Sequence, residues 1–236
     1  MTAAEFEPLS FTRLPPAEML QRARAFYAEL DRRRTTRHFS TEPVPRELLE
    51  LAIRTAGTAP SGAHREPWRF ALVDDTDLKV KMRAAAEAEE AQNYHGRMPQ
   101  EWLDALAPLG TDEHKAHITD APWVIVVFKQ LYELRADGAR VRNYYVDESV
   151  GIAAGLLIAA IHHMGLVTLT HTPSPMGFLA TVLRRPANER AYLLMPVGYP
   201  ARDAMVPALR RRGLEELLTH NIGPSQDVNR DGLAVP

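Results

Sequence analysis

A basic segment in the first fifth of the chain contains residue types that can bind phosphate. It reads Arg33-Arg34-Thr35-Thr36-Arg37. Guanidinium groups form paired hydrogen bonds with phosphate oxygens, and the two threonine hydroxyls add further donors. Because charged runs are usually solvated, the same segment also fits an ordinary surface turn. The residues alone leave both interpretations open.

A second basic cluster, Arg210-Arg211-Arg212, lies far away in the sequence. Two clusters that converged in space would suit a phosphorylated cofactor. Neither the GxGxxG pattern of dinucleotide-binding folds nor the GxxxxGK[ST] pattern of P-loops is present. We therefore expect that any phosphate site here belongs to another class of fold.

Residues 55–70, TAGTAPSGAHREPWRF, form a loop between an amphipathic helix and an apolar strand. Gly62 allows the main chain to approach a flat or anionic ligand closely, and its small neighbours Ser61 and Ala63 leave their N–H groups accessible. Read without any other information, the same residues fit a simple helix-to-strand turn. The functional interpretation is that the loop presents its backbone to a ligand.

Composition narrows the possible functions. The chain has 236 residues, a formal net charge of -2 and no cysteine, which excludes disulfides, thiolate metal sites and cysteine nucleophiles. The balanced charge argues against a general role on nucleic acids or membrane surfaces. The adjacent residues His162 and His163 come without an HExxH pattern, so we expect no metal site. With no basic, apolar leader and no segment expected to span a bilayer, we predict a soluble, cytoplasmic protein.

The elements that must position these residues follow from hydrophobic periodicity and from turn signals. We expect four strands, at residues 68–74, 121–130, 166–170 and 191–200. We expect helices at residues 16–33, 43–57, 77–93, 99–117, 147–164 and 176–184. The polar stretch 133–145 is predicted to be a loop. Residues 1–220 are expected to form one domain, followed by a tail, residues 221–236, that is either mobile or held by a partner subunit.

Five motifs together resemble those of a known family. They are RRTTRHF at residues 33–39, the loop at residues 55–68, EEAQNYHGRM at 89–98, GLVTLTHTP at 165–173 and PVGYP at 196–200. The chain from about residue 32 to residue 217 is similar to the iodotyrosine deiodinase branch of the FMN-dependent nitroreductase superfamily. The second and third motifs are long, which makes the resemblance specific.

The resemblance implies an FMN cofactor and assigns its contacts. The residues implied to hold its phosphate and ring edge are Arg33, Arg34, Thr35, Arg37 and Arg211. The residues implied to lie against the flavin are Pro60, Ser61 and Gly62. Thr172 is implied to aim its hydroxyl at flavin N5, with Thr170 as the competing choice. A donor there favours single-electron steps over hydride transfer, although threonine is also an ordinary strand residue.

The resemblance also assigns the substrate contacts. The N–H of Ala63 is implied to bind the phenolate, so Ala63 and Thr172 are the expected catalytic positions. Glu90, Tyr94 and Lys115, in a lid at about residues 90–118, are implied to bind the amino-acid end of a halotyrosine. Opposite charges suit a zwitterion. On the residues alone, a solvated helix face would be the simpler interpretation.

The resemblance implies an α+β fold with a mixed, mainly antiparallel sheet flanked by helices, in a homodimer that exchanges terminal arms. The implied reaction is reductive dehalogenation of 3-iodotyrosine, and of bromo and chloro analogues, to tyrosine and halide. The electron donor, NAD(P)H or a reductase, is left open, and no nucleic acid, membrane or metal is expected. The alternatives are a general FMN nitroreductase or quinone reductase that uses NAD(P)H, and a flavin-binding protein without catalysis.

Overall fold

The computed structural model describes residues 4–221. Its contacts divide the chain into two units, Met1–Val206 and Pro207–Pro236, which are described separately. The expected tail, apart from its first residue, lies outside the described residues, so its order stays a prediction. The second unit contains the short helix α8 (Leu214–Leu217), next to an ion pair of 2.7 Å between Arg210 and Glu216.

The first unit is built on a four-stranded antiparallel sheet in the order β1-β2-β6-β5. The bounds of the strands are β1 (Trp68–Val73), β2 (Trp123–Gln130), β5 (Val167–Thr168) and β6 (Glu189–Gly198). The long strands β2 and β6 form its centre, and a bulge interrupts their pairing between Val127 and Phe128. A parallel bridge from Thr35 to Thr168 extends the sheet beyond β5. The predicted mixed, mainly antiparallel sheet is confirmed.

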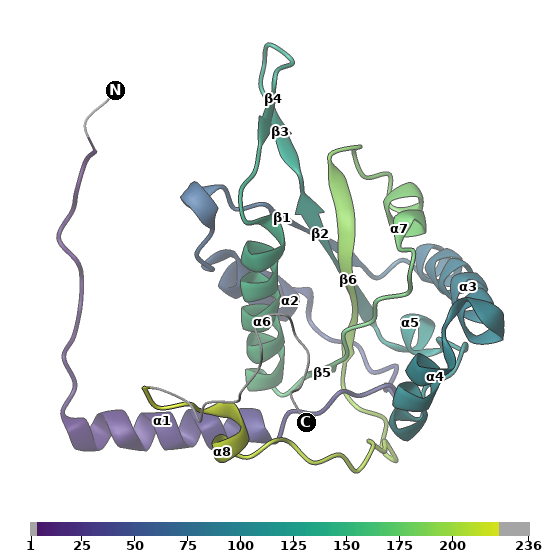
Figure 1. The fold of residues 1–236 in the computed structure, drawn as a ribbon, viewed down its shortest axis with the longest axis horizontal. Coiled ribbons are helices and arrows are strands. Elements are labelled where there is room, and N and C mark those ends of the chain that lie inside the picture. Colours follow the sequence, from purple (N-terminus) through teal and green to yellow (C-terminus); the bar gives the residue numbers. More distant parts are fainter. Residues whose placement is uncertain (1–3, 222–236) are drawn as a thin grey trace, which may run out of the picture. The chain divides into compact units, whose positions relative to one another are not determined.

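Helices cover both faces of this sheet (Figure 1). Side chains alternate along a strand, so neighbouring residues serve opposite layers. Ile125 and Val127 pack in one layer with α2 (Arg46–Gly57) and α6 (Val146–His163). Val124 and Val126 pack in the other layer with α3 (Thr76–Gln92), α5 (His117–Asp120) and α7 (Gly177–Val182). Both faces of β2 are therefore buried, which explains its continuous apolar sequence.

The central helix α6 is apolar nearly all round, and it packs against α2 and against the sheet. Its residues Val150, Leu157 and Ile161 are fully buried. By length and composition alone it could cross a membrane. The expectation that no segment would meet that criterion is therefore wrong. About a third of this helix is buried inside the chain, whereas Ile152 is 48% exposed, so packing within the single chain accounts for only part of its apolar composition.

Two predicted connections differ from the structure. The expected helix at residues 99–117 is broken into α4 (Gln100–Leu106), the 3-10 turn η3 (Ala107–Leu109) and α5. Gly110 ends the middle piece in the left-handed conformation, a common helix terminator. The expected loop at residues 133–145 contains a hairpin of β3 (Tyr132–Leu134) and β4 (Arg140–Arg142). Gly138, with φ of 81°, forms its turn, and the preceding Asp137 makes this an Asp-Gly hairpin signal.

The N-terminal helix α1 (Pro16–Asp31) has no buried residue in the single chain. Two histidines at the end of α6 hold it. The ring of His162 contacts the carbonyl of Glu29 at 2.8 Å, and the ring of His163 contacts the Glu29 carboxylate at 2.7 Å. These contacts give both histidines a structural role, since they hold α1 against the end of α6.

Candidate active site

The lid residues are carried by α3 and by the turn that follows it. The side chain of Asp75 caps α3 by accepting a hydrogen bond from the N–H of Leu78 at 2.8 Å. Lys79, buried on the same helix, donates to the carbonyl of Ala121 at 2.9 Å, and burial lowers its pKa. These contacts fix α3 against the start of β2. Its C-terminal end runs into the π-helical turn η2 (Asn93–Arg97).

Glu90, Tyr94 and Lys115 meet at this end of α3. Nζ of Lys115 lies 3.8 Å from Oε2 of Glu90 and 5.7 Å from the ring centroid of Tyr94. The hydroxyl of Tyr94 donates to the carbonyl of Thr111 at 3.0 Å. Glu90 and Lys115 are both buried. The structure thus brings together the three residues predicted to bind the amino-acid end of a substrate.

Burial governs the electrostatics of this cluster. It lowers the pKa of Lys115, although the nearby carboxylates of Glu90 and Asp112 oppose the shift. It raises the pKa of Tyr94, so the phenol stays protonated at neutral pH. Burial also lowers the pKa of Arg37, whose charge is felt by Lys115 and Tyr94. Arg37 therefore lies at the boundary between the basic segment and the lid.

The basic segment runs beside β5. The N–H of Thr36 donates to the carbonyl of Thr168 at 3.3 Å, next to the bridge from Thr35. Beyond β5, His171 pairs with Leu194 in the sheet, and both of its backbone hydrogen bonds measure 2.9 Å.

The candidate threonines flank that paired residue. Thr170 and Thr172 are exposed, whereas His171 is buried. Alternation along the extended chain places both hydroxyl-bearing side chains on the side opposite the histidine. The choice between Thr170 and Thr172 therefore stays open. The basic segment lies along the β5 edge of the sheet, where Thr35 bridges Thr168, and it contains Arg33, Arg34, Thr35 and Arg37.

The glycine loop has a backbone shaped for close approach. A Cβ on Gly62 would lie 2.8 Å from Cδ2 of Tyr145 and 2.9 Å from the carbonyl oxygen of Tyr144. Its N–H donates to Oγ of Ser149 at 3.3 Å. Glycine is thus required here by packing against the start of α6, whereas the sequence had suggested approach to a ligand.

The unusual backbone conformation falls on the next residue. Ala63 adopts φ of 50° and ψ of 33°, in the 3-10 turn η1 (Gly62–His64). Ala63 is exposed, and within residues 4–221 its N–H donates to no acceptor. Pro60 is exposed and Ser61 is partly buried, with Oγ of Ser61 accepting the N–H of Glu66 at 2.9 Å. The loop therefore offers a main-chain donor, as predicted for the phenolate.

A single chain does not bring this loop to the basic segment. Gly62 packs on the first turn of α6, whereas β5 begins just after its last turn. With 18 residues, α6 is about 27 Å long. Residues 60–63 and residues 33–37 therefore lie at opposite ends of α6. Arg211 belongs to the second unit, and its position relative to these groups is not described.

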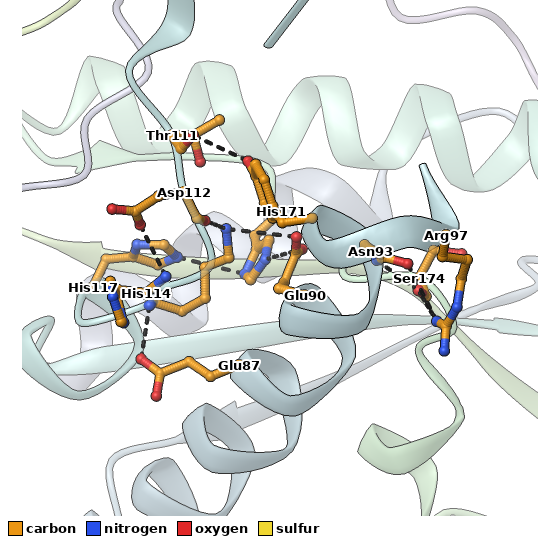
Figure 2. Close-up of polar contacts among 12 residues, drawn as sticks. Glu87, Glu90, Asn93, Arg97, Thr111, Asp112, His114, His117, His171 and Ser174 are labelled. Carbon is orange, nitrogen blue, oxygen red and sulfur yellow. Dashed lines mark hydrogen bonds and ion pairs between the residues drawn. The ribbon is translucent and has the colours of Figure 1, made fainter. Parts of the chain in front are cut away.

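Four further polar residues near this end of α3 were not assigned roles from the sequence. Asn93 and Arg97 donate to the carbonyl of Ser174 at 3.0 and 3.3 Å. Nε2 of His171 lies 3.4 Å from Oε1 of Glu90, and Nδ1 of His171 lies 3.5 Å from Nε2 of His117 (Figure 2).

The sequence carried a weak signal for some of these residues. Asn93 and Arg97 belong to a motif that was recognised, and His171 sits between the two candidate threonines. His117 carried no signal, because nothing in the sequence indicates that it meets His171. Within the described part of the chain, no group of three His, Asp or Glu side chains could hold a metal ion.

Comparisons with known proteins define the family. A sequence model of the nitroreductase family matches residues 30–199. An iodotyrosine deiodinase from Haliscomenobacter hydrossis is 54% identical over 207 residues, which cover 88% of this chain and 93% of the relative. The chain belongs to the iodotyrosine deiodinase branch of the nitroreductase family. Iodotyrosine deiodinase 1 of Pongo abelii is 46% identical over 215 residues, which cover 91% of this chain and 74% of that protein.

A solved structure supports the same branch. The crystal structure of an oxidized iodotyrosine deiodinase bound to FMN and 3-iodo-L-tyrosine superposes with a TM-score of 0.71 at 28% identity. The match covers 84% of this chain and all of that one. The nitroreductase-family match includes the basic segment, the glycine loop, the lid and the strand of Thr170 and Thr172. Arg211 lies beyond its end.

Proposed function

We propose that this protein is an FMN-dependent iodotyrosine deiodinase, which reductively removes halogen from 3-iodotyrosine and from its bromo and chloro analogues. The observation that carries the proposal is the convergence of Glu90, Tyr94 and Lys115. A general nitroreductase has no use for a buried carboxylate beside a buried ammonium group. A free amino acid presents an ammonium and a carboxylate, and thus needs both.

Glu90 and Lys115 are paired loosely enough that each could leave the other for a charged group of the substrate. At 3.8 Å the two charged groups attract each other without a short hydrogen bond. A zwitterion that entered between them would give Glu90 an ammonium and Lys115 a carboxylate, so that no charge is left buried and alone. The specificity of the proposed enzyme for amino acids follows from this exchange.

The residues of the basic segment fit FMN. Arg37 is partly buried, and within residues 4–221 no carboxylate forms an ion pair with it, so an anion is the partner that its environment lacks. We assign the FMN phosphate and ring edge to Arg33, Arg34, Thr35 and Arg37, whereas the role of Arg211 stays a prediction from the sequence. Pro60, Ser61 and Gly62 would lie along the ring, and Thr172 or Thr170 would donate to N5. When bound and reduced, FMN supplies two electrons.

The chain's own groups hold and orient the substrate. With two electrons and one proton, the carbon–iodine bond is replaced by a carbon–hydrogen bond and iodide leaves. The N–H of Ala63 would donate to the phenolate oxygen and fix the halogen-bearing ring. Closing of the lid over the zwitterion would exclude water and place the ring productively.

We further propose that the active site is shared between two copies of the chain in a homodimer. The glycine loop and the basic segment lie at opposite ends of α6, so a second copy must bring its loop to the first copy's arginines. Exposed apolar residues on α1 support an extensive interface. They are Met19, Leu20, Phe26 and Tyr27, each at least half exposed in the single chain.

Complementation between two inactive variants tests the shared site. One variant would lack the phosphate contacts (Arg33→Ala with Arg37→Ala), and the other would carry Ala63→Pro, which removes the N–H donor. Coexpressed, the two should form heterodimers with one intact site, which restores about a quarter of wild-type activity. Sites built within one chain would give no recovery.

An anaerobic assay tests the reaction itself. The FMN-loaded protein is reduced with dithionite and mixed with 3-iodotyrosine, a nitroarene or neither, while flavin absorbance and released iodide are followed. Rapid reoxidation with one iodide per flavin is expected for iodotyrosine. Reoxidation by the nitroarene alone would instead indicate a nitroreductase, and no response a flavin-binding protein. NAD(P)H or a reductase as the electron donor and the cytoplasmic location stay predictions.

A further inference from the structure

His171 occupies a fixed position between the two candidate threonines. Both of its backbone groups pair with Leu194, at 2.9 Å each, so the main chain at this point is held in the sheet. Thr170 and Thr172 are exposed on one side of the extended chain. The imidazole points to the other side, where it is buried with 8% of its surface exposed.

The imidazole contacts the carboxylate that faces the substrate's ammonium in the proposed function. Nε2 of His171 lies 3.4 Å from Oε1 of Glu90, while Oε2 of Glu90 faces Lys115 at 3.8 Å. Within residues 4–221 the Glu90 side chain has no other polar partner. A buried carboxylate needs such partners, because a charge that is removed from water without them is strongly destabilised. His171 is therefore one of two groups that hold Glu90.

His117 supports His171 from behind. Its Nε2 lies 3.5 Å from Nδ1 of His171, and the two rings meet edge to face with centroids 5.1 Å apart. Burial lowers the pKa of both histidines, although the Glu90 carboxylate opposes the shift at His171, and the positive charges of Lys115 and Arg37 lower both pKa values further. Both rings are thus neutral near neutral pH.

One tautomer arrangement satisfies this chain of contacts. Since ionised Glu90 only accepts hydrogen bonds, Nε2 of His171 must carry the proton and donate to it. Nδ1 of His171 then accepts from Nε2–H of His117. The pair forms a directed relay of donors that ends on Oε1 of Glu90 and leaves Oε2 for a cation.

We propose that His171 is a positioning residue for substrate selection, one that holds the Glu90 carboxylate in place to receive the ammonium group of the amino-acid substrate. This inference rests on the proposed function and deepens it. When Lys115 turns to the substrate's carboxylate, His171 remains as the protein partner of Glu90. A carboxylate already held in one rotamer loses less entropy on binding. Because His171 lies between Thr170 and Thr172, the same strand residue links the ammonium site to the cofactor side of the sheet.

A matched pair of variants isolates the contact. His171→Gln places an amide N–H near the position of Nε2, whereas His171→Asn is polar but one methylene too short to reach Glu90. The ligands are 3-iodotyrosine and its deaminated analogue, 3-(4-hydroxy-3-iodophenyl)propanoate, which keeps the phenol, the halogen and the carboxylate. Their dissociation constants are measured by titration of flavin fluorescence with the FMN-loaded protein.

His171→Asn should weaken iodotyrosine binding about ten-fold or more while leaving the deaminated analogue within about two-fold of wild type. His171→Gln should recover most of the loss. Equal weakening of both ligands by His171→Asn, or no weakening of either, would overturn the positioning role. If the wild-type protein itself fails to bind iodotyrosine, the proposed function falls and this inference with it, so the two failures are distinguished. Should His171→Asn fail to fold, His117→Leu replaces it, with the same selective loss expected because the relay loses its first donor.

Discussion

Nζ of Lys115 lies 3.8 Å from Oε2 of Glu90, with 4% and 9% of the two side chains exposed. Lys115 also donates to the carbonyl of Asp112, so it is held by its own loop as well as by α3. A buried pair of this kind costs desolvation energy that a surface pair does not. In the proposed enzyme, that cost is offset when a zwitterion supplies a closer partner to each group.

Replacing Glu90 by Gln should weaken the binding of 3-iodotyrosine by about ten- to a hundred-fold, because a charge-assisted contact with the ammonium group is lost. FMN should remain bound, which flavin absorbance after gel filtration checks. Glu89→Gln is the matched control, since Glu89 pairs with Arg97 at 2.9 Å and does not touch the cluster. A dissociation constant unchanged in Glu90→Gln would contradict the assignment of the ammonium site.

The two threonines can be separated by their hydroxyls. Alanine at the position that contacts the cofactor should slow single-turnover release of iodide by about ten-fold, because one donor is removed. Alanine at the other position should leave the rate unchanged. Thr172→Ser and Thr170→Ser keep the hydroxyl and serve as controls. We expect the effect at Thr172, whereas equal rates for Thr172→Ala and wild type would move the role to Thr170 or remove it.

Gly62→Ala should destabilise the protein by about 1–3 kcal/mol, because the added methyl group meets the ring of Tyr145 and the Tyr144 carbonyl. Gly57→Ala is the control. No heavy atom lies within 4 Å of a Cβ built there, and Gly57 ends α2, so alanine should be neutral or stabilising by up to about 1 kcal/mol. Urea unfolding at a fixed protein concentration measures both. Equal stability of the two variants would show that the loop shifts freely.

Stability should fall as the pH is lowered through the range between the two pKa values of His117. Burial is the main cause that lowers its pKa from 6.5 to about 3, and the neighbouring His171 ring and the positive charges of Lys115, Arg37 and Arg83 act in the same direction. Between these pH values His117 is protonated in the unfolded chain but neutral in the folded protein, so the free energy of unfolding rises with pH in this window. From pH 8 to pH 5 the contribution lost is about 2 kcal/mol.

Thermal unfolding of wild type and His117→Gln at both pH values measures this contribution. The melting temperature of the variant should fall by about 4–8 °C less than that of the wild type when the pH is lowered from 8 to 5. Titratable groups that do not contact His117 are common to both proteins and cancel in the comparison, whereas His171, which contacts it, contributes to the measured difference. Identical pH dependence of the two proteins would mean that His117 is protonated, or accessible, in the folded state.

Much of the fold follows from local sequence signals. Hydrophobic patterns and the Gly, Pro and Asp residues at turns predicted all four strands of the main sheet and the covering helices α2, α3, α6 and α7, but not α5. The errors fell where local signals were weak. The hairpin of β3 and β4 is polar and only three residues long per strand, and Gly110 stops a segment whose composition favours a helix.

The sequence by itself determined the family and the candidate residues, because motifs such as residues 55–68 and 89–98 are contiguous and can be recognised without knowledge of the fold. Only the tertiary structure decided which of those residues meet. Glu90, His171 and Lys115 come from three separate segments, and their contacts depend on how α3 and β6 pack. Gly62 and Arg37 are closer in sequence than Glu90 and His171 but lie at opposite ends of α6. Chain proximity does not fix spatial proximity, since packing of distant elements sets the distances over which charges and hydrogen bonds act.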